Sequence, residues 1–324
     1  MEVGDIPVTI VHPGSGTTVA IDAGQTGIKV RTRSGVEPHV EAVYPGVRTH
    51  EPLLPQLAEV VRAQQRELGR PVESVAFGVS GLTRSQSDAG ALLAALGDVG
   101  ARHVLLAHDS VTSFLGSLGD AQGAVIAAGT GVVTLGVGPD RIARVDGWGN
   151  IMGDAGSAYW IGREALEAAM RAHDGRESPT ALTEAVRERW DDIEDAYVQL
   201  QSDPDRVRIV ASFASSVTTL ADVDAASAQI ALRAARELAR SVVTALRRVE
   251  DPTDPDAEEA VSAIGGVFTS PLILGRFSEL VTEARPTARI VSPRGTGLDG
   301  ATMLFDVPPQ HPLTEFIRVA KVDR

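Results

Sequence analysis

The chain has 324 residues, a formal net charge of −13 at pH 7 and no cysteine. That length corresponds to about two domains, with enough apolar sequence to build a core without disulfides. The acidic balance disfavours a nucleic-acid binder held by phosphate contacts and a basic membrane-surface protein. The absence of cysteine excludes disulfide scaffolds, thiolate zinc sites, iron–sulfur clusters and cysteine nucleophiles.

Lysine occurs only at Lys29 and Lys321. Neither follows a glycine, so the sequence has no G-x-x-x-x-G-K-[ST] phosphate loop. No apolar run reaches the roughly 18 residues of a membrane-spanning helix. Residues 1–16 lack the basic start and the apolar stretch of a signal peptide. We therefore expect a cytoplasmic protein with no membrane partner and no nucleic-acid partner.

The first part of the chain alternates between predicted strands and helices after an extension over residues 1–16. Alternating or continuous apolar runs predict strands, and apolar residues at every third or fourth position predict helices. The expected strands are 17–24, 27–33, 36–43, 74–81 and 103–110, and the expected helices are 52–68, 85–97 and 110–118.

The same order restarts at residue 123, with strands expected at 123–131, 132–138, 141–147, 261–266 and 288–292. A mostly helical region over about 154–250, most clearly periodic at 225–249, is inserted in this copy, and helices at 271–283 and 298–306 follow. This alternation predicts an α/β fold with mixed sheets flanked by helices. The expected parts are a first domain over 1–118, a second over 119–306, and a C-terminal tail over 307–324 that packs back on the first domain.

A glycine-rich turn follows the first strand of each copy. In the first copy, Asp22 precedes Gly24-Gln25-Thr26-Gly27, and in the second the strand ends in Gly129-Thr130-Gly131. Glycine permits tight turns whose backbone N–H groups can bind an anion, and a carboxylate beside a phosphate makes sense with Mg²⁺ between them. Either turn alone could be an ordinary hairpin, but the corresponding pair favours a nucleotide site.

Three further features lie at strand ends. Gly265-Gly266 would let a flat ring approach the backbone, whereas Gly295-Thr296-Gly297 is more typical of a helix entrance. Asp109, at the end of a strand, suits either a general base or a helix N-cap. The residues alone do not decide between these two roles.

The most distinctive stretch is 145–160, which contains two of the three tryptophans and several glycines. Trp148 offers an apolar face to a ligand, and Asp154 can accept hydrogen bonds from hydroxyl groups. The helix that begins here would direct its N-terminus to the same place. The alternative is a packed loop in which a tryptophan fills the core.

The order of these motifs resembles the sugar kinase/Hsp70/actin superfamily, and within it the N-acetylglucosamine kinase family, also called the BadF/BadG/BcrA/BcrD ATPase family. The segment GWGNIMGDAGSAYWIG matches that family's G-W-G-x-x-x-G-D-x-G-S-A-x-W-x-G signature. DAGQT and AAGTG match its two phosphate motifs, IGG its adenosine motif, and HDS the segment that carries its catalytic aspartate. The resemblance spans residues 17–306.

The resemblance implies two ribonuclease-H-like (actin-like ATPase) domains with a cleft between them. The implied activity is an ATP- and Mg²⁺-dependent kinase acting on the 6-hydroxyl of an amino sugar, N-acetylglucosamine or glucosamine. Asp109 would be the general base, and Asp22 would hold Mg²⁺ through water. The implied nucleotide residues are Gly24, Gln25, Thr26, Gly129, Thr130, Gly131, Gly265 and Gly266, and the implied sugar residues are Ser80, Asp109, Thr130, Gly147, Trp148, Asp154 and Ala158.

The sequence departs from the family at Ala155, where Glu is frequent, and at Val132 and Val133, where Ser or Asn is frequent. These changes remove polar groups near the sugar and leave the preferred sugar open. The cysteines of the separate ROK kinases and of the dehydratase activators are absent.

A catalytically weak sugar or nucleotide sensor on the same fold is the alternative function. Retention of Asp22 and Asp109 favours an enzyme, and an actin-like filament protein would give the Trp148 segment no role. The histidines show no H-E-x-x-H spacing, so we expect His108 to be structural rather than a metal ligand. The helix at 225–249 is apolar enough for a core or for the face of a homodimer.

Overall fold

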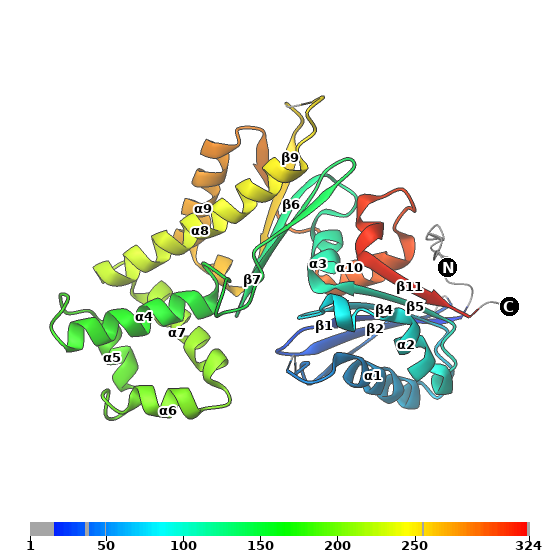
Figure 1. Ribbon diagram of the computed structural model, residues 1–324, viewed down its shortest axis with the longest axis horizontal. Coiled ribbons are helices and arrows are strands. Elements are labelled where there is room, and N and C mark those ends of the chain that lie inside the picture. The colour runs from blue at the N-terminus through cyan, green and yellow to red at the C-terminus, as the bar shows by residue number, and fades with distance from the viewer. Residues whose placement is uncertain (1–15, 36–38, 49, 255, 323–324) are drawn as a thin grey trace. The chain divides into compact units, whose positions relative to one another are not determined.

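Two compact units make up the fold in a computed structural model, which describes residues 16–35, 39–48, 50–254 and 256–322 (Figure 1). The second unit consists of residues 123–138 and 143–292, and the first unit of the remaining described residues. The expected extension over residues 1–16 lies, except for Gly16, outside the described residues.

The first unit is built on a six-stranded sheet in the order β11-β5-β4-β1-β2-β3. β1, β4 and β5 run parallel, and β2, β3 and β11 pair antiparallel with their neighbours. The strands are β1 Thr17–Ala23, β2 Ile28–Ser34, β3 Val40–Tyr44, β4 Ser74–Val79, β5 His103–His108 and β11 Ile317–Lys321. β11 adds an edge strand that the sequence analysis did not identify.

Helices cover both faces of this sheet. They are α1 Leu53–Leu68, α2 Ala89–Ala95, α3 Asp109–Leu118 and α10 Gly297–Met303. Since side chains alternate along a strand, Val19 and Ile21 of β1 join the core with α1 and α2, while Ala20 packs against α10. β4, which is covered on both faces, is buried along its whole length.

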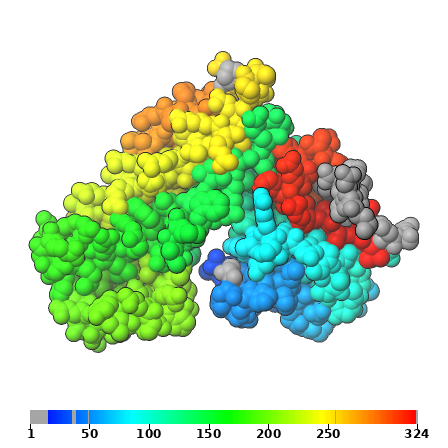
Figure 2. Space-filling model, viewed as in Figure 1, coloured from blue at the N-terminus to red at the C-terminus, as the bar shows by residue number. Residues whose placement is uncertain are grey.

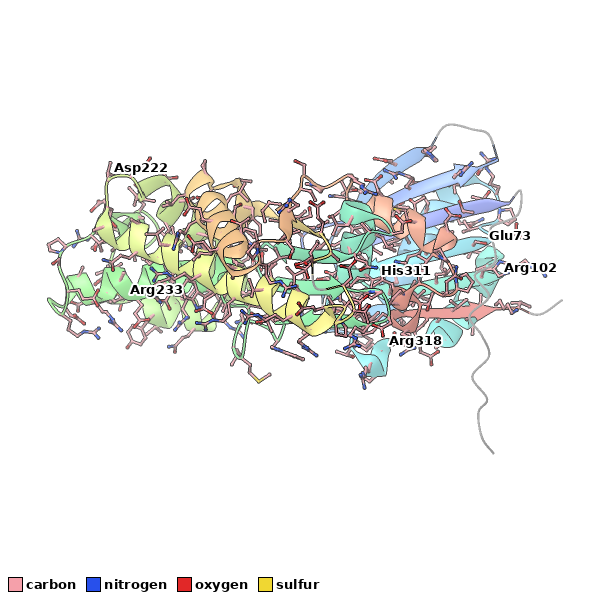
Figure 3. The ribbon with its side chains drawn as sticks, turned by 90° about the horizontal axis from the view of Figure 1, so that it is seen from above. Glu73, Arg102, Asp222, Arg233, His311 and Arg318 are labelled. Atoms are coloured by element: carbon pink, nitrogen blue, oxygen red, sulfur yellow. The ribbon has the colours of Figure 1, made fainter. Side chains whose placement is uncertain are left out.

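The parallel strands fix one edge of the sheet as the place for the site. Glu73 and Arg102 precede β4 and β5 and lie together at one end of the sheet (Figure 3). At the other end, Ala23, Val79 and His108 are aligned in register. The residues that follow these three strand ends are therefore brought together.

The second unit repeats the arrangement, with a sheet in the order β10-β9-β6-β7-β8. β6 pairs antiparallel with β7 and parallel with β9, as β1 does with β2 and β4. The predicted α/β fold with a duplicated unit is therefore confirmed. The strands are β6 Gly123–Ala128, β7 Val132–Val137, β8 Ile142–Val145, β9 Glu259–Ile264 and β10 Ala288–Ile290.

The helical insertion lies between β8 and β9, and one further helix precedes β10. The helices of the insertion are α4 Ala158–His173, α5 Leu182–Arg187, α6 Ala196–Ser202, α7 Arg206–Leu220 and α8 Ala225–Val249. The helix that precedes β10 is α9 Pro271–Ala284. The apolar face of α8 lies in the core of this unit. Side chains fill the space that the ribbons leave between α4, α5, α6 and α7 (Figure 2).

No single helix of the described chain is long and apolar enough to cross a membrane. The bent pair α7–α8 passes that test by length and composition alone. Its apolar residues, including Phe213 and Leu238, are part of the core of the second unit.

α3 and α10 cross at a contact that only glycine permits. A Cβ on Gly116 would lie 1.9 Å from the carbonyl oxygen of Thr296, and one on Gly300 would lie 1.7 Å from that of Thr112. α10 therefore belongs with the first unit, although the sequence analysis grouped it with the second domain. The following tail contributes β11 to the first sheet.

Candidate active site

Two carboxylates lie at the C-terminal edge of the first sheet. Asp22 is near the end of β1, and Asp109 is the first residue of α3. Gly78 of β4 separates their strands, and a Cβ there would lie 2.2 Å from Thr112 Oγ1. Because Gly78 has no side chain, α3 approaches the sheet closely and holds Asp109 at this edge.

Asp22 lies in an electrostatically unfavourable position for a carboxylate. Burial, opposed by Lys29 and reinforced by the nearby Asp109, raises its pKa to about 6. Lys29 is the cross-strand partner of Asp22 in β2. Gly297 packs on the carboxyl group, so that a Cβ at this position would lie 2.9 Å from Asp22 Oδ2.

Asp109 is held in its ionised form. Burial raises its pKa, but His108 and Ser80 lower it by more, and the result is a pKa below the ordinary value. Its side chain is 26% exposed, and its Oδ1 lies 2.8 Å from His108 Nδ1. His108, whose ring accepts from Ser110 N, is the N-cap of α3, so the N-cap interpretation of Asp109 is wrong.

The chemistry of this edge fits a hydrated Mg²⁺. Two carboxylates lie close enough to raise the pKa of Asp22, and Asp109 Oδ1 has no hydrogen-bond partner among the described residues. In the described part of the chain, no three His, Cys, Asp or Glu side chains gather as a metal site. Asp22 could thus hold a cation that keeps most of its ligands as water and phosphate, as Mg²⁺ does.

The β1–β2 turn is closed by its own backbone. Gly24 N donates to Gly27 O at 3.1 Å, and Val47 N donates to Gly24 O at 3.0 Å. Gly46 lies against the turn, where a Cβ would be 2.0 Å from the carbonyl oxygen of Gln25. Gln25 and Thr26 are exposed at the tip. Since the N–H of Gly24 is already bonded, the tip residues are the ones free to meet a phosphate.

In the second unit, the β6–β7 turn is fastened to the start of α4. Ala158 N donates to Gly129 O at 2.8 Å, and Tyr159 N donates to Thr130 O at 3.2 Å. These bonds use the first N–H groups of α4. The N-terminus of α4 therefore holds the β6–β7 turn in place, and the expectation that it also faces a ligand stays a prediction.

Asp146 organises the loop that follows β8. Its Oδ1 accepts from Gly147 N at 2.8 Å and Asp154 N at 2.9 Å, and its Oδ2 accepts from Ala155 N at 3.1 Å. Asp146 and Asp154 both have positive φ, 59° and 57°. The sequence analysis assigned Asp146 no role, although an acidic residue directly before glycine is a signal for such a turn.

This loop brings Asp154 to the phosphate turn of the same unit. Asp154 Oδ1 accepts from Gly149 N at 3.2 Å, and a Cβ on Gly131 would lie 2.6 Å from its Oδ2. Burial and the neighbouring Asp146 raise the pKa of Asp154. The second unit thus brings Gly131 and Asp154 together, while the first unit groups Asp22, Ser80 and Asp109.

The two tryptophans of this segment differ. Trp148 is 61% exposed, and the Arg144 guanidinium lies 5.2 Å from its ring centroid. Arg144 also donates to Gly147 O. Trp160 packs against the core beneath Arg233 of α8, labelled in Figure 3. The core-plug alternative is therefore wrong for Trp148, whose face is open.

The remaining glycine motifs have separate roles. Gly265 has φ +99°, and a Cβ there would lie 2.3 Å from the carbonyl oxygen of Ala128, whereas Gly266 faces open space. Thr296 caps α10 in a capping box with Asp299, which also binds Arg31 at 2.7 Å. The expectation of a helix entrance at 295–297 is confirmed.

Comparison with known proteins gives a family match over most of the chain. The model of the BadF/BadG/BcrA/BcrD ATPase family matches residues 14–304. An N-acetylmuramic acid/N-acetylglucosamine kinase from Clostridium acetobutylicum is 25% identical over 276 residues, which cover 79% of this chain and 85% of the relative.

Two solved structures share the fold. A candidate N-acetylglucosamine kinase from Chromobacterium violaceum has a TM-score of 0.72 at 23% identity, over 90% of this chain and 100% of that one. A ROK hexokinase from Thermus thermophilus has a TM-score of 0.54 at 16% identity, over 92% and 99%. The expected fold is confirmed.

Proposed function

Because the chain belongs to the BadF/BadG/BcrA/BcrD ATPase family, we propose that it is an ATP-dependent sugar kinase that phosphorylates the 6-hydroxyl of an amino sugar. N-acetylglucosamine and glucosamine are the proposed acceptors. The observation that carries the proposal is the pairing of Asp109, whose pKa is held below its ordinary value, with Asp22 at the same strand edge.

In the proposed reaction, Asp109 accepts the proton of the sugar hydroxyl while its oxygen attacks the γ-phosphorus of ATP. The new O6–P bond forms as the bond to the β-phosphate oxygen breaks, and ADP leaves with that electron pair. Because the pKa of Asp109 is low, the base is ionised at neutral pH. Mg²⁺ supplies charge neutralisation on the phosphates, and Asp22 is the residue that would hold it through water.

The remaining contacts are proposed on the motifs. Gln25 and Thr26 of the first unit, with the Gly129–Gly131 turn of the second, would contact phosphates, Gly24 would close the first turn beneath them, and Gly265 and Gly266 would contact the adenosine. Ser80, Thr130, Asp154 and the 147–148 and 158 positions would line the sugar. The open face of Trp148 supports this assignment, since an exposed indole can stack on a sugar ring. We place the reaction in the cytoplasm, where ATP is available, and leave a homodimer as a proposal.

The test is a coupled ADP-release assay over glucosamine, N-acetylglucosamine and N-acetylmuramic acid. We expect sugar-stimulated ADP release, and Asp109→Asn should lower it by about 10²–10⁴-fold while ATP binding is retained. Asp222→Asn is the matched control, because Asp222 lies in an exposed turn between α7 and α8 (Figure 3). Absence of stimulation by any sugar, with ATP still bound, would favour the sensor alternative.

A further inference from the structure

His108 shares one ring nitrogen among three neighbours. Its Nδ1 lies 2.8 Å from Asp109 Oδ1, 2.9 Å from Ser110 Oγ and 3.1 Å from Ser110 N. A single imidazole nitrogen either accepts a hydrogen bond or donates one. The ring can therefore cap α3 by accepting from Ser110, or it can donate to Asp109, but Nδ1 cannot do both at once.

Pairing Nδ1 with the Asp109 carboxylate stabilises the site more than pairing it with the backbone N–H of Ser110. Asp109 Oδ1 is buried and has no hydrogen bond among the described residues, and an unpaired lone pair of Nδ1 at 2.8 Å would repel it. A buried anionic oxygen without a donor costs more than a helix N–H without a cap. The contact is within ion-pair distance but is not aligned as a hydrogen bond, and catalytic hydrogen bonds often tighten only when substrate binds.

We propose that His108 is a positioning residue that donates Nδ1–H to Asp109 Oδ1, so that Oδ2 is left to take the proton of the substrate hydroxyl. The inference rests on the proposed role of Asp109 as the base. It goes beyond the expectation that His108 is merely structural, because the ring then sets both the orientation and the proton affinity of the base. Ser110 Oγ lies 2.9 Å from the same nitrogen. When Nδ1 donates to Asp109, the hydroxyl of Ser110 no longer donates to Nδ1.

Charged side chains on the elements that pack against β5 and α3 interact with other groups. Asp22 of β1 acts on Asp109 by charge, and Lys29 of β2 acts on Asp22. On α10, Asp299 is bonded to Arg31 and to Thr296. On β11, Arg318 is aligned with Leu106 and donates to Glu315 O (Figure 3). Among these groups, His108 is the one in direct contact with Asp109, with Nδ1 2.8 Å from Oδ1.

Two substitutions of similar shape separate the donor role from a packing role. His108→Asn places an amide nitrogen where Nδ1 stands, and His108→Leu places a methyl group there. We expect His108→Leu to lower kcat by about 10-fold at pH 7 and to move the acid limb of the kcat–pH profile up by about 1 pH unit, since Asp109 loses the hydrogen bond that holds its pKa down. His108→Asn should restore most of both quantities.

A measurement without turnover completes the test. NMR measurement of the ¹⁵N shifts of the His108 ring should show the proton on Nδ1 in the wild type, because Nδ1 must carry a proton to donate to Asp109 Oδ1. A ring that carries its proton only on Nε2, together with an unmoved acid limb in His108→Leu, would overturn the positioning role while leaving the kinase proposal intact. No sugar-stimulated ADP release from the wild type would instead refute the proposed function itself.

Discussion

The loop held by Asp146 provides the sharpest test of the sugar-binding assignment. Asp146 accepts from three backbone N–H groups, and it does so with a positive φ that Asn tolerates and Ala does not. Asp146→Asn keeps the size and the backbone preference, but one carboxylate oxygen becomes a donor and loses its partner. Asp146→Ala loses all three acceptor contacts.

The expected magnitude follows from those contacts. A hydrogen bond to a charged group is worth about 1.5–3 kcal/mol, and because Asp146 is only half-buried, we discount this for solvent screening to about 1–2 kcal/mol. If this loop must be ordered to bind sugar, kcat/KM for N-acetylglucosamine falls by about 5–30-fold in Asp146→Asn. Asp146→Ala adds the cost of its positive φ and should lose about 100-fold or more.

The assay compares the two substrates of the same enzyme. Steady-state kinetics would give kcat/KM for the sugar at saturating ATP and for ATP at saturating sugar. We expect the KM for ATP to stay within about twofold of the wild type, since the loop carries none of the proposed nucleotide contacts. Sugar constants within twofold of the wild type in both variants would refute the reasoning.

Two other predictions concern the Asp22 carboxylate. The pKa of Asp22 in the folded protein, about 6, lies above the ordinary value of 3.8, so ionisation of Asp22 destabilises the folded state, and this effect is complete above pH 6. Asp22→Asn should therefore abolish turnover but raise the free energy of unfolding by up to about 3 kcal/mol at pH 8. This gain in stability should disappear as the pH falls through 6 towards 3.8. Equal stability of both proteins at pH 8 in urea melts would contradict this. Gly297→Ala places a methyl group against the same carboxylate, so it should raise the Mg²⁺ concentration for half-maximal activity several-fold. It should also weaken Mn²⁺ binding several-fold, as measured by relaxation without turnover. Gly275→Ala, whose methyl group would face open space, is the control, and identical metal dependence in the two variants would disprove the contact.

Local sequence patterns predicted the elements of this fold well where the pattern and the packing agree. α8 was identified at 225–249 because its apolar face alternates with charge at helical spacing, and that face is the one buried in the core. The helix expected at 85–97 begins only at Ala89, because Asp88 caps it after a short turn. β11 was not predicted as a strand, because an edge strand of five residues depends on a partner, β5, that lies far away in the sequence.

The site was predictable to a similar extent. Strand-end residues such as Asp22 and Asp109 follow from the topology, since parallel strands end at one edge. The support around them depends on contacts between distant segments. Neither the three bonds accepted by Asp146 nor the packing of Gly297 against Asp22 has a sequence signature, because each needs a partner that only the folded chain supplies.

The edge of β5 is completed by β11, and the groove over α3 by α10, both from the last part of the sequence. Until β11 and α10 have been synthesised, β5 therefore has an unpaired edge, and Gly116 of α3 is not covered by α10. The second unit, by contrast, comes from one stretch, residues 123–292, apart from residues 139–142. The first sheet is therefore complete only when the stretch after residue 292, which carries α10 and β11, is available to pack.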